Sequence, residues 1–308
     1  MLRVLLLALS ASAAPMYGPN GGQVELPMPG AGSDPRSDQE FRLGPDGACG
    51  AWGAGSGPVT AEIPFGNTTY TVDLYGKPGQ SGRRRTVVLL HGATGDKRKV
   101  VRQTGFDDVI ARDGGLLVVP DGLEVDGIGK MWDNGSLKSG EVRNDADFLD
   151  AVVRWAEANA CAGNVMAVGF SNGAQMAMRW ACGSAAPDIV MTHAGTIKVP
   201  TCNGRNRWLL AYAGSKDPWH LEREMSRAVP SEIEAAHLWH GGSTRPATDP
   251  ATVEVEGKRT CSTWTGNNPV QLCVIEGWGH KWPSPITNSS LPFDATEHAW
   301  RFFKNHLP

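Results

Sequence analysis

The chain has 308 residues, of which 41% are hydrophobic and 20% are charged, as is typical of a soluble globular protein. Its 29 basic and 32 acidic residues nearly cancel to a net charge of -3, so it lacks the strong positive field of proteins that bind nucleic acid or anionic membranes. We therefore expect neither nucleic acid nor a membrane as a partner, and the length fits one globular domain with a leader.

The first residues carry the pattern of a secretory signal peptide. Arg3 precedes an apolar run, and Ala11-Ser12-Ala13 provides a cleavage site of the A-x-A type. No later stretch approaches the ~20 uninterrupted apolar residues that a membrane helix needs. We predict a signal peptide over residues 1–13, a Gly/Pro-rich leader or linker over 14–58 and a catalytic domain over 59–308, secreted into the extracellular or periplasmic space.

The predicted elements alternate between strands and helices along the catalytic domain. Period-two alternation predicts antiparallel strands at 59–63 and 68–75. Apolar runs predict buried strands at 86–90, 116–119, 164–168, 190–193 and 208–212, and apolar residues three and four apart predict helices at 100–114, 140–160, 171–182 and 292–307. This order predicts the α/β class, with a mostly parallel central sheet and helices on both faces.

The segment Gly169-Phe170-Ser171-Asn172-Gly173 lies between a predicted buried strand and the helix that follows it. Strand, tight turn and helix form the context of a G-x-S-x-G nucleophile, in which the glycines allow the serine to sit on a strained turn. A serine that only caps the helix is the alternative, but a cap does not account for the two glycines. We therefore predict that Ser171 is a catalytic nucleophile.

A serine hydroxyl needs a histidine to take its proton and an acid to orient that histidine. Asp217 lies in a loop after the predicted strand at 208–212, and His280 lies in a loop after a later strand-like run. The order serine, acid, histidine is the order used by the α/β-hydrolase fold. A purely turn-forming Asp217 and a catalytic His298 are the alternatives. We predict Asp217 as the acid and His280 as the base.

The negative oxygen of a tetrahedral intermediate must be met by backbone amides. We expect one donor from Asn172, directly after the nucleophile. The loop after the strand at 86–90 supplies the second, for which we predict Ala93, with Thr94 as the alternative. His91 opens this loop, and because it precedes the nucleophile in the chain we expect it to brace the loop rather than to transfer protons.

Six cysteines in a chain with an export signal favour disulfides over metal binding. Cys261 and Cys273 flank a predicted turn at 266–269, so we expect them to pair across a hairpin. No C-x-x-C motif with a neighbouring histidine is present, and we expect no metal site. Chain position and elimination give the two other expected pairs, Cys182 with Cys202 and Cys49 with Cys161.

The segments LLHGATG, VVPDG, GFSNGAQMAMRWAC and GWGHKWP occur in this order between residue 59 and the C-terminus. At these segments the chain resembles the secreted polyhydroxybutyrate depolymerase-like and feruloyl esterases, a branch of the α/β-hydrolase superfamily without a large cap domain. The resemblance implies that Ser171, Asp217 and His280 hydrolyse a carboxylic ester without a metal or organic cofactor. It also implies that Trp132, in the loop after VVPDG, lines the substrate cleft.

Trp282 lies two positions after His280, and we expect its ring to contact substrate, with packing in the core as the alternative. The expected substrates are feruloyl or acetyl esters of plant polysaccharide and polyesters such as polyhydroxybutyrate. A serine peptidase or an acyltransferase on the same fold is an alternative activity, since a triad alone does not decide the acceptor. A catalytically inactive binding protein is the remaining alternative.

Overall fold

The computed structural model describes residues 58–76, 82–134, 143–195, 207–217, 232–241, 248–286, 288 and 293–307. The predicted signal peptide and all but the last residue of the predicted leader lie outside these residues, as do Cys49 and Cys202. In the described part of the chain, no helix combines the length and the apolar character that crossing a membrane requires.

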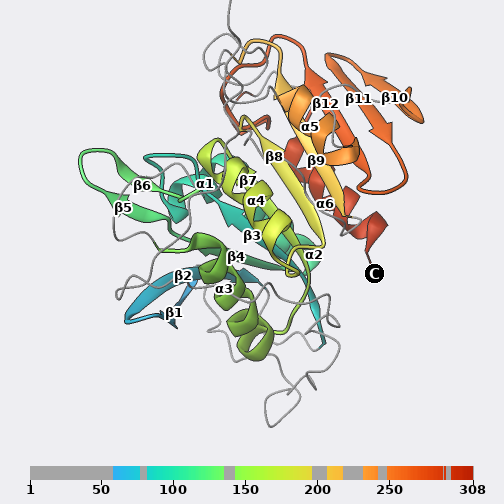
Figure 1. Cartoon of the computed structure of the whole chain (residues 1–308). Coiled ribbons are helices and arrows are strands. Elements are labelled where there is room, and N and C mark those ends of the chain that lie inside the picture. Colours follow the sequence, from blue (N-terminus) through green and yellow to red (C-terminus); the bar gives the residue numbers. More distant parts are fainter. Residues whose placement is uncertain are drawn as a thin grey trace, which may run out of the picture. The chain divides into compact units, whose positions relative to one another are not determined.

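A ten-stranded sheet runs through the described residues in the order β1-β2-β4-β3-β7-β8-β9-β12-β11-β10 (Figure 1). Neighbouring strands from β4 through β12 in this order are parallel, and the pairs at both edges are antiparallel. Every strand predicted from the sequence is confirmed. The strands are β1 (Val59–Phe65), β2 (Thr68–Gly76), β3 (Arg84–Leu90), β4 (Leu116–Pro120), β7 (Ala162–Phe170), β8 (Ile189–His193), β9 (Trp208–Gly214), β10 (Thr252–Glu256), β11 (Arg259–Trp264) and β12 (Val270–Ile275), with β5 (Leu123–Val125) and β6 (Gly129–Met131) in a separate hairpin.

Helices cover both faces of this sheet, because parallel strands are joined by crossovers that place a helix on one face or the other. Each face has its own buried apolar cluster. Among the described elements none forms a separate cap domain. Helices α3 (Asp145–Ala160), α4 (Asn172–Gly183) and α5 (Glu232–Gly241) pack on one face, and α1 (Lys97–Thr104), α2 (Phe106–Asp113) and α6 (Ala295–His306) pack on the other (Figure 1).

The helix predicted over 100–114 is two helices, so that prediction is wrong at its centre. Gly105 ends α1 with a left-handed φ of 69°, and its amide donates to the carbonyl of Val101. The same residue then precedes the first turn of α2. Glycine adopts this conformation without the steric cost that other residues incur, so the chain turns between two short amphipathic helices.

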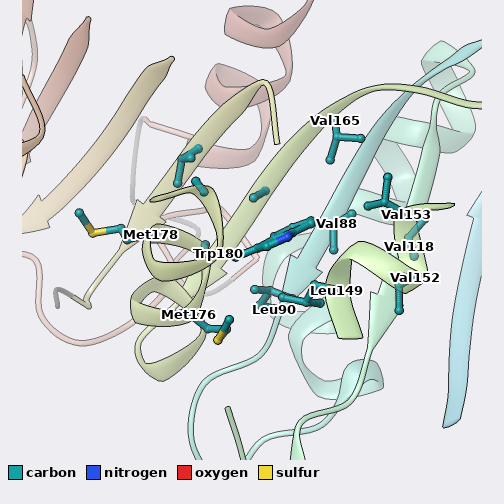
Figure 2. Packing of buried hydrophobic residues seen from close by; sticks show 14 of the residues in the cluster. Val88, Leu90, Val118, Leu149, Val152, Val153, Val165, Met176, Met178 and Trp180 are labelled. Carbon is teal, nitrogen blue, oxygen red and sulfur yellow. The ribbon is translucent and has the colours of Figure 1, made fainter. Parts of the chain in front are cut away.

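Trp180 anchors α4 in the core of its face. Figure 2 shows its indole among Val88 and Leu90 of β3 and Leu149 of α3. The side chain is fully buried, and its ring N–H donates to the Asp150 carboxylate of α3 at 2.7 Å. An indole buried in this way contributes a large apolar area and satisfies its one donor. Helix α4 is therefore fixed to both the sheet and α3.

The disulfide between Cys261 and Cys273 is present and confirms the predicted pair. The two cysteines lie opposite each other in the antiparallel register of β11 and β12. Cys161 and Cys182 are also disulfide-bonded. Their predicted partners, Cys49 and Cys202, lie outside the described residues.

Leu149→Ala should lower the free energy of unfolding by about 2–5 kcal/mol, because it removes a fully buried side chain between α3 and the sheet and leaves a cavity. Chemical denaturation followed by circular dichroism measures the change. Arg154→Ala is the matched control, since Arg154 is exposed on the same helix, and it should change the stability by less than about 0.5 kcal/mol. Equal losses in the two variants would contradict this description of the core.

Candidate active site

Ser171 sits on a tight turn between β7 and α4. Its φ of 54° and ψ of -121° lie outside the regions that a non-glycine residue normally adopts. A Cβ on Gly169 would overlap the backbone of Gly173, and a Cβ on Gly173 would overlap the carbonyl of Leu90 in β3. The two glycines therefore allow β7, α4 and β3 to approach closely enough to impose this conformation on the serine.

Three side chains predicted from the sequence lie in one hydrogen-bonded chain. The Nε2 atom of His280 lies 3.0 Å from Ser171 Oγ, and its Nδ1 atom lies 2.8 Å from Asp217 Oδ2. With the proton on Nδ1, the ring donates to the carboxylate and leaves the Nε2 lone pair to accept from the serine hydroxyl. Asp217 is 1% exposed, whereas the His280 side chain is 31% exposed. The series of hydrogen bonds therefore leads from a buried carboxylate to a histidine that solvent reaches.

The acid and base loops hydrogen-bond to each other. The Lys216 amide donates to the Trp278 carbonyl at 2.7 Å, and the Gly277 amide donates to Ser215 Oγ at 2.7 Å. The Asp217 amide closes its own turn by donating to the Gly214 carbonyl at 2.9 Å. These loops follow the adjacent parallel strands β9 and β12, so their meeting at one edge of the sheet is a consequence of the strand order.

Backbone amides are available beside the serine. A Cβ on Gly92 would lie 3.2 Å from Ser171 Cβ, so the loop after β3 packs against the serine. Within the described residues, the amides of Ala93 and Asn172 donate no hydrogen bond to the protein, and Asn172 opens α4. The Thr94 amide donates to the Lys130 carbonyl at 2.9 Å, so it is not a free donor. The arrangement therefore supports Ala93 over the alternative Thr94.

Trp132 is a brace for this loop, and the expectation that its ring lines a cleft is wrong. The indole is fully buried, and its Nε1–H donates to the His91 carbonyl at 3.0 Å. Its backbone amide donates to Asn172 Oδ1 at 2.7 Å, and the Asn172 side-chain amide donates back to the Trp132 carbonyl at 3.2 Å. Trp132 therefore connects the loop after β3 with the first residue of α4.

His91 braces the same loop. Its Nε2 atom accepts from the Gly122 amide at 2.9 Å, and Nδ1–H donates to the Gly92 carbonyl at 2.7 Å. Burial lowers the pKa of His91, which keeps the ring neutral and consistent with one donated and one accepted hydrogen bond. The ring is 1% exposed. Proton transfer to substrate is therefore not a role that its position supports.

Trp282 is also buried, at 2% exposure, so the expectation that it contacts substrate is wrong in the same way. Its ring nitrogen donates to Thr296 Oγ1 at 3.0 Å, and its ring packs edge-on against Phe170 and His193. The large apolar area of the indole therefore anchors the loop that carries His280 in the apolar core. The alternative stated from the sequence, that Trp282 packs in the core, agrees with this burial.

His193 is a site residue that the sequence did not indicate. Its backbone carbonyl accepts from the Ser171 amide at 2.9 Å, and its Nε2 atom lies 2.6 Å from the carbonyl of Lys281, the residue after His280. Burial lowers the pKa of His193 to about 4, so the ring is neutral at pH 7. The signal that could have identified it is its position as the last residue of β8, at the edge where the other loops meet.

His298, the alternative base, lies on α6 with its Nδ1 atom 2.5 Å from Tyr212 Oη, while His280 occupies the position beside Ser171. Among the described residues, no group of histidines, cysteines and carboxylates could hold a metal ion.

No protein-family model and no curated protein matches the chain. Among solved structures, it is similar to the acetyl xylan esterase from Aspergillus awamori, with a TM-score of 0.60 and 15% identity over 80% of this chain and 99% of that one. The carboxylesterase from Bacillus cereus aligns with a TM-score of 0.49 and 15% identity over 78% of this chain and 96% of that one. The chain has the α/β-hydrolase fold. At this identity the similarity shows the fold and not the activity.

Within this hydrolase fold, Trp132→Phe should lower the free energy of unfolding by about 1–3 kcal/mol, because it leaves the buried His91 carbonyl without its donor. Thermal and chemical denaturation measure the loss. Trp155→Phe is the matched control: Trp155 is half-buried on α3, and within the described residues its ring N–H has no partner to lose. If Trp132→Phe is no less stable than Trp155→Phe, the bracing role is wrong.

Proposed function

We propose that the chain is a secreted serine carboxylic ester hydrolase that acts through an acyl-serine intermediate. The observation that carries this proposal is the hydrogen-bonded chain from Asp217 through His280 to Ser171, with the serine held in a strained turn after β7. The same geometry supports the three residues as a catalytic triad.

In the proposed reaction His280 Nε2 takes the Ser171 hydroxyl proton as Oγ attacks the ester carbonyl carbon. The buried Asp217 carboxylate stabilises the imidazolium that forms and holds the ring in orientation. The imidazolium then gives its proton to the departing alkoxide, which leaves as an alcohol, while the acyl group stays bonded to Ser171 Oγ. A water molecule, deprotonated by His280, attacks this acyl group and releases the acid, and Ser171 recovers its proton.

The amides of Ala93 and Asn172 are the proposed oxyanion donors. Asn172 follows the serine in the chain, Ala93 follows Gly92, which packs against the serine, and neither amide donates a hydrogen bond to another described residue. Asn172 is also the first residue of α4, where the helix dipole favours a negative charge. Because Trp132 and His91 hold these segments in place, the donors need no rearrangement when the oxyanion forms.

Feruloyl or acetyl esters of plant polysaccharide and polyesters such as polyhydroxybutyrate are the proposed substrates. The resemblance of the sequence motifs supports these classes, and the name of the Aspergillus neighbour supports the acetylated polysaccharide among them. The 31% exposure of His280 supports a site that a polymer chain can reach. The signal-peptide pattern and the disulfides support secretion, because disulfides persist in oxidising compartments.

Ser171→Ala should lower kcat on p-nitrophenyl acetate and on methyl ferulate by about 10⁴-fold to 10⁶-fold and abolish labelling by a fluorophosphonate probe, because the nucleophile is gone. Ser262→Ala, at a partly exposed serine on β11, is the control and should keep both activities. Unchanged hydrolysis by Ser171→Ala would contradict the proposal. Mass spectrometry of products from mixed ester, peptide and alcohol substrates distinguishes an esterase from a peptidase or an acyltransferase.

Asp217→Asn should lower kcat at pH 7 by about 10⁴-fold with a smaller change in KM. An amide at this position donates to Nδ1 and places the ring proton on Nε2, which then cannot accept from Ser171. Steady-state kinetics on p-nitrophenyl acetate test this, with circular dichroism to verify folding. Asp249→Asn, at an exposed carboxylate, should retain the wild-type rate; a similar loss there would show that the effect is not specific to the triad.

A further inference from the structure

A pocket of about 470 Å³ lies between α6 and the strands β9 to β12, where the hairpin of β10 and β11 extends the sheet. Trp208, at one end of the pocket, is the first residue of β9, whereas Asp217 follows the other end of that strand. A strand of seven residues spans about 20 Å. The Trp208 end of the pocket is therefore a separate site from the triad.

Helix α6 and the floor of the pocket supply hydrogen-bond donors. The hydroxyl of buried Tyr212 lies 2.5 Å from Nδ1 of His298, and burial with Arg259 and Arg301 nearby lowers the pKa of His298 to about 4. Arg259 is fixed by its hydrogen bond to Glu256 at 2.5 Å and by packing over the Phe293 ring at 4.6 Å. Its Nε has no partner among the described residues.

Strand β10 and the floor supply acceptors. Glu254 and Glu256 alternate along β10, so their side chains share the face that lines the pocket. Gln271, 8% exposed, donates through its Nε2 to Thr263 Oγ1 at 3.2 Å, and its Oε1 accepts from no described residue. A buried acceptor without a partner is costly, and a hydrogen-bond donor that reached it would relieve that cost.

The charges of the pocket are balanced. Arg259 and Arg301 are matched by Glu254 and Glu256, and His298 is neutral at pH 7. A ligand with a net charge of either sign therefore gains little from the pocket as a whole. A neutral ligand that both donates and accepts hydrogen bonds fits this lining better, and hydroxyl groups do both.

An aromatic group forms the end of the pocket at Trp208. The His306 ring stacks on Phe302 with centroids 3.9 Å apart, and the half-buried Trp208 ring lies edge-on to both, at 4.7 Å from His306 and 5.2 Å from Phe302. Such a group offers an apolar surface beside polar walls. A sugar ring has this combination, with C–H groups on its faces and hydroxyls at its rim.

We propose that this pocket binds a neutral sugar unit of an oligosaccharide or polysaccharide, with the ring against the Trp208 group and its hydroxyls between the α6 donors and the β10 carboxylates. This site goes beyond the proposed ester hydrolysis, because binding there uses no triad residue. It gives the protein a place to hold a carbohydrate chain apart from the reacting bond.

Binding is measured on the full chain carrying Ser171→Ala, so that no ester is cleaved during titration. The probes are soluble xylan, mannan and β-glucan in affinity electrophoresis, and xylohexaose, mannohexaose and cellohexaose in isothermal titration calorimetry. At least one of these carbohydrates should bind. Trp208→Ala, and the pair Glu254→Gln with Arg301→Ala at exposed positions, should each weaken that binding at least tenfold.

Glu62→Gln with Arg154→Ala is the matched control, because it removes the same charges from exposed positions on β1 and α3 and should leave binding unchanged. The proposal is overturned if no carbohydrate binds, or if the pocket variants bind as well as the control. It is also overturned if glucuronate or inorganic phosphate displaces the oligosaccharide at equal concentration, since that result identifies an anion site.

Turnover of p-nitrophenyl acetate distinguishes failure of the carbohydrate-binding proposal from failure of the hydrolase proposal. With Ser171 intact, the pocket variants should keep the wild-type rate on this small ester. Absence of any ester turnover in the wild type would count against the hydrolase proposal and leave the binding result standing. On an acetylated polysaccharide, the pocket variants should have a higher KM than the wild type and the same kcat. This measurement rests on the proposed function.

Discussion

The close packing of backbone around Ser171 is the constraint on which the rest of the site depends. A side chain at Gly169, Gly173 or Gly195 would overlap backbone atoms of a neighbouring segment, so β3, β7 and the start of α4 approach this closely only with glycine at these positions. The packing imposes a positive φ on Ser171, which costs on the order of 1–3 kcal/mol for a non-glycine residue. The apolar clusters on both faces of the sheet must therefore stabilise the turn from outside.

Hydrogen bonds between segments far apart in the sequence extend this constraint to the base. His193 has a central place in them, because its backbone carbonyl accepts from the Ser171 amide while its ring contacts the carbonyl of Lys281. One residue of β8 thus connects the nucleophile with the loop that carries His280. The Trp278 ring nitrogen donates to the same Lys281 carbonyl at 2.6 Å, so the indole and the imidazole both contact that carbonyl. The loop that carries His280 is therefore held to β8, the same strand that accepts from the Ser171 amide.

The proximity of the three residues of the proposed triad could be predicted from the sequence because each lies in the turn or loop that follows a strand of the sheet. Parallel strands bring their carboxyl ends to one edge, so the order of Ser171, Asp217 and His280 in the chain carries spatial information. The bracing contacts carry no such signal. Trp132 and Asn172 are 40 positions apart, and their reciprocal hydrogen bonds depend on side-chain orientations that no periodic pattern encodes.

The break between α1 and α2 and the strand β10 were not predicted from the sequence, and each has a local physical reason. A glycine inside a helix costs only about 1 kcal/mol, so an apolar pattern that continues past Gly105 gives no indication that the helix ends there. Strand β10 has a period-two sequence, but all of its side chains are exposed, so the pattern does not indicate a buried face. The part of β10 in lining a pocket can be recognised only from the folded structure, because residues of both β10 and α6 form that pocket.

Burial distinguishes the tryptophans that support the site from Trp208, which is half-buried and lines a pocket. A strained nucleophile needs rigid neighbours, and an indole supplies both a large packing area and one directed donor. Trp132 and Trp282 are used in this way, with their ring nitrogens bonded to His91 and Thr296. Trp208 lines an open pocket instead. On the proposed mechanism, these buried rings hold the oxyanion loop and the base in register, whereas Trp208 is proposed to contact a sugar ring.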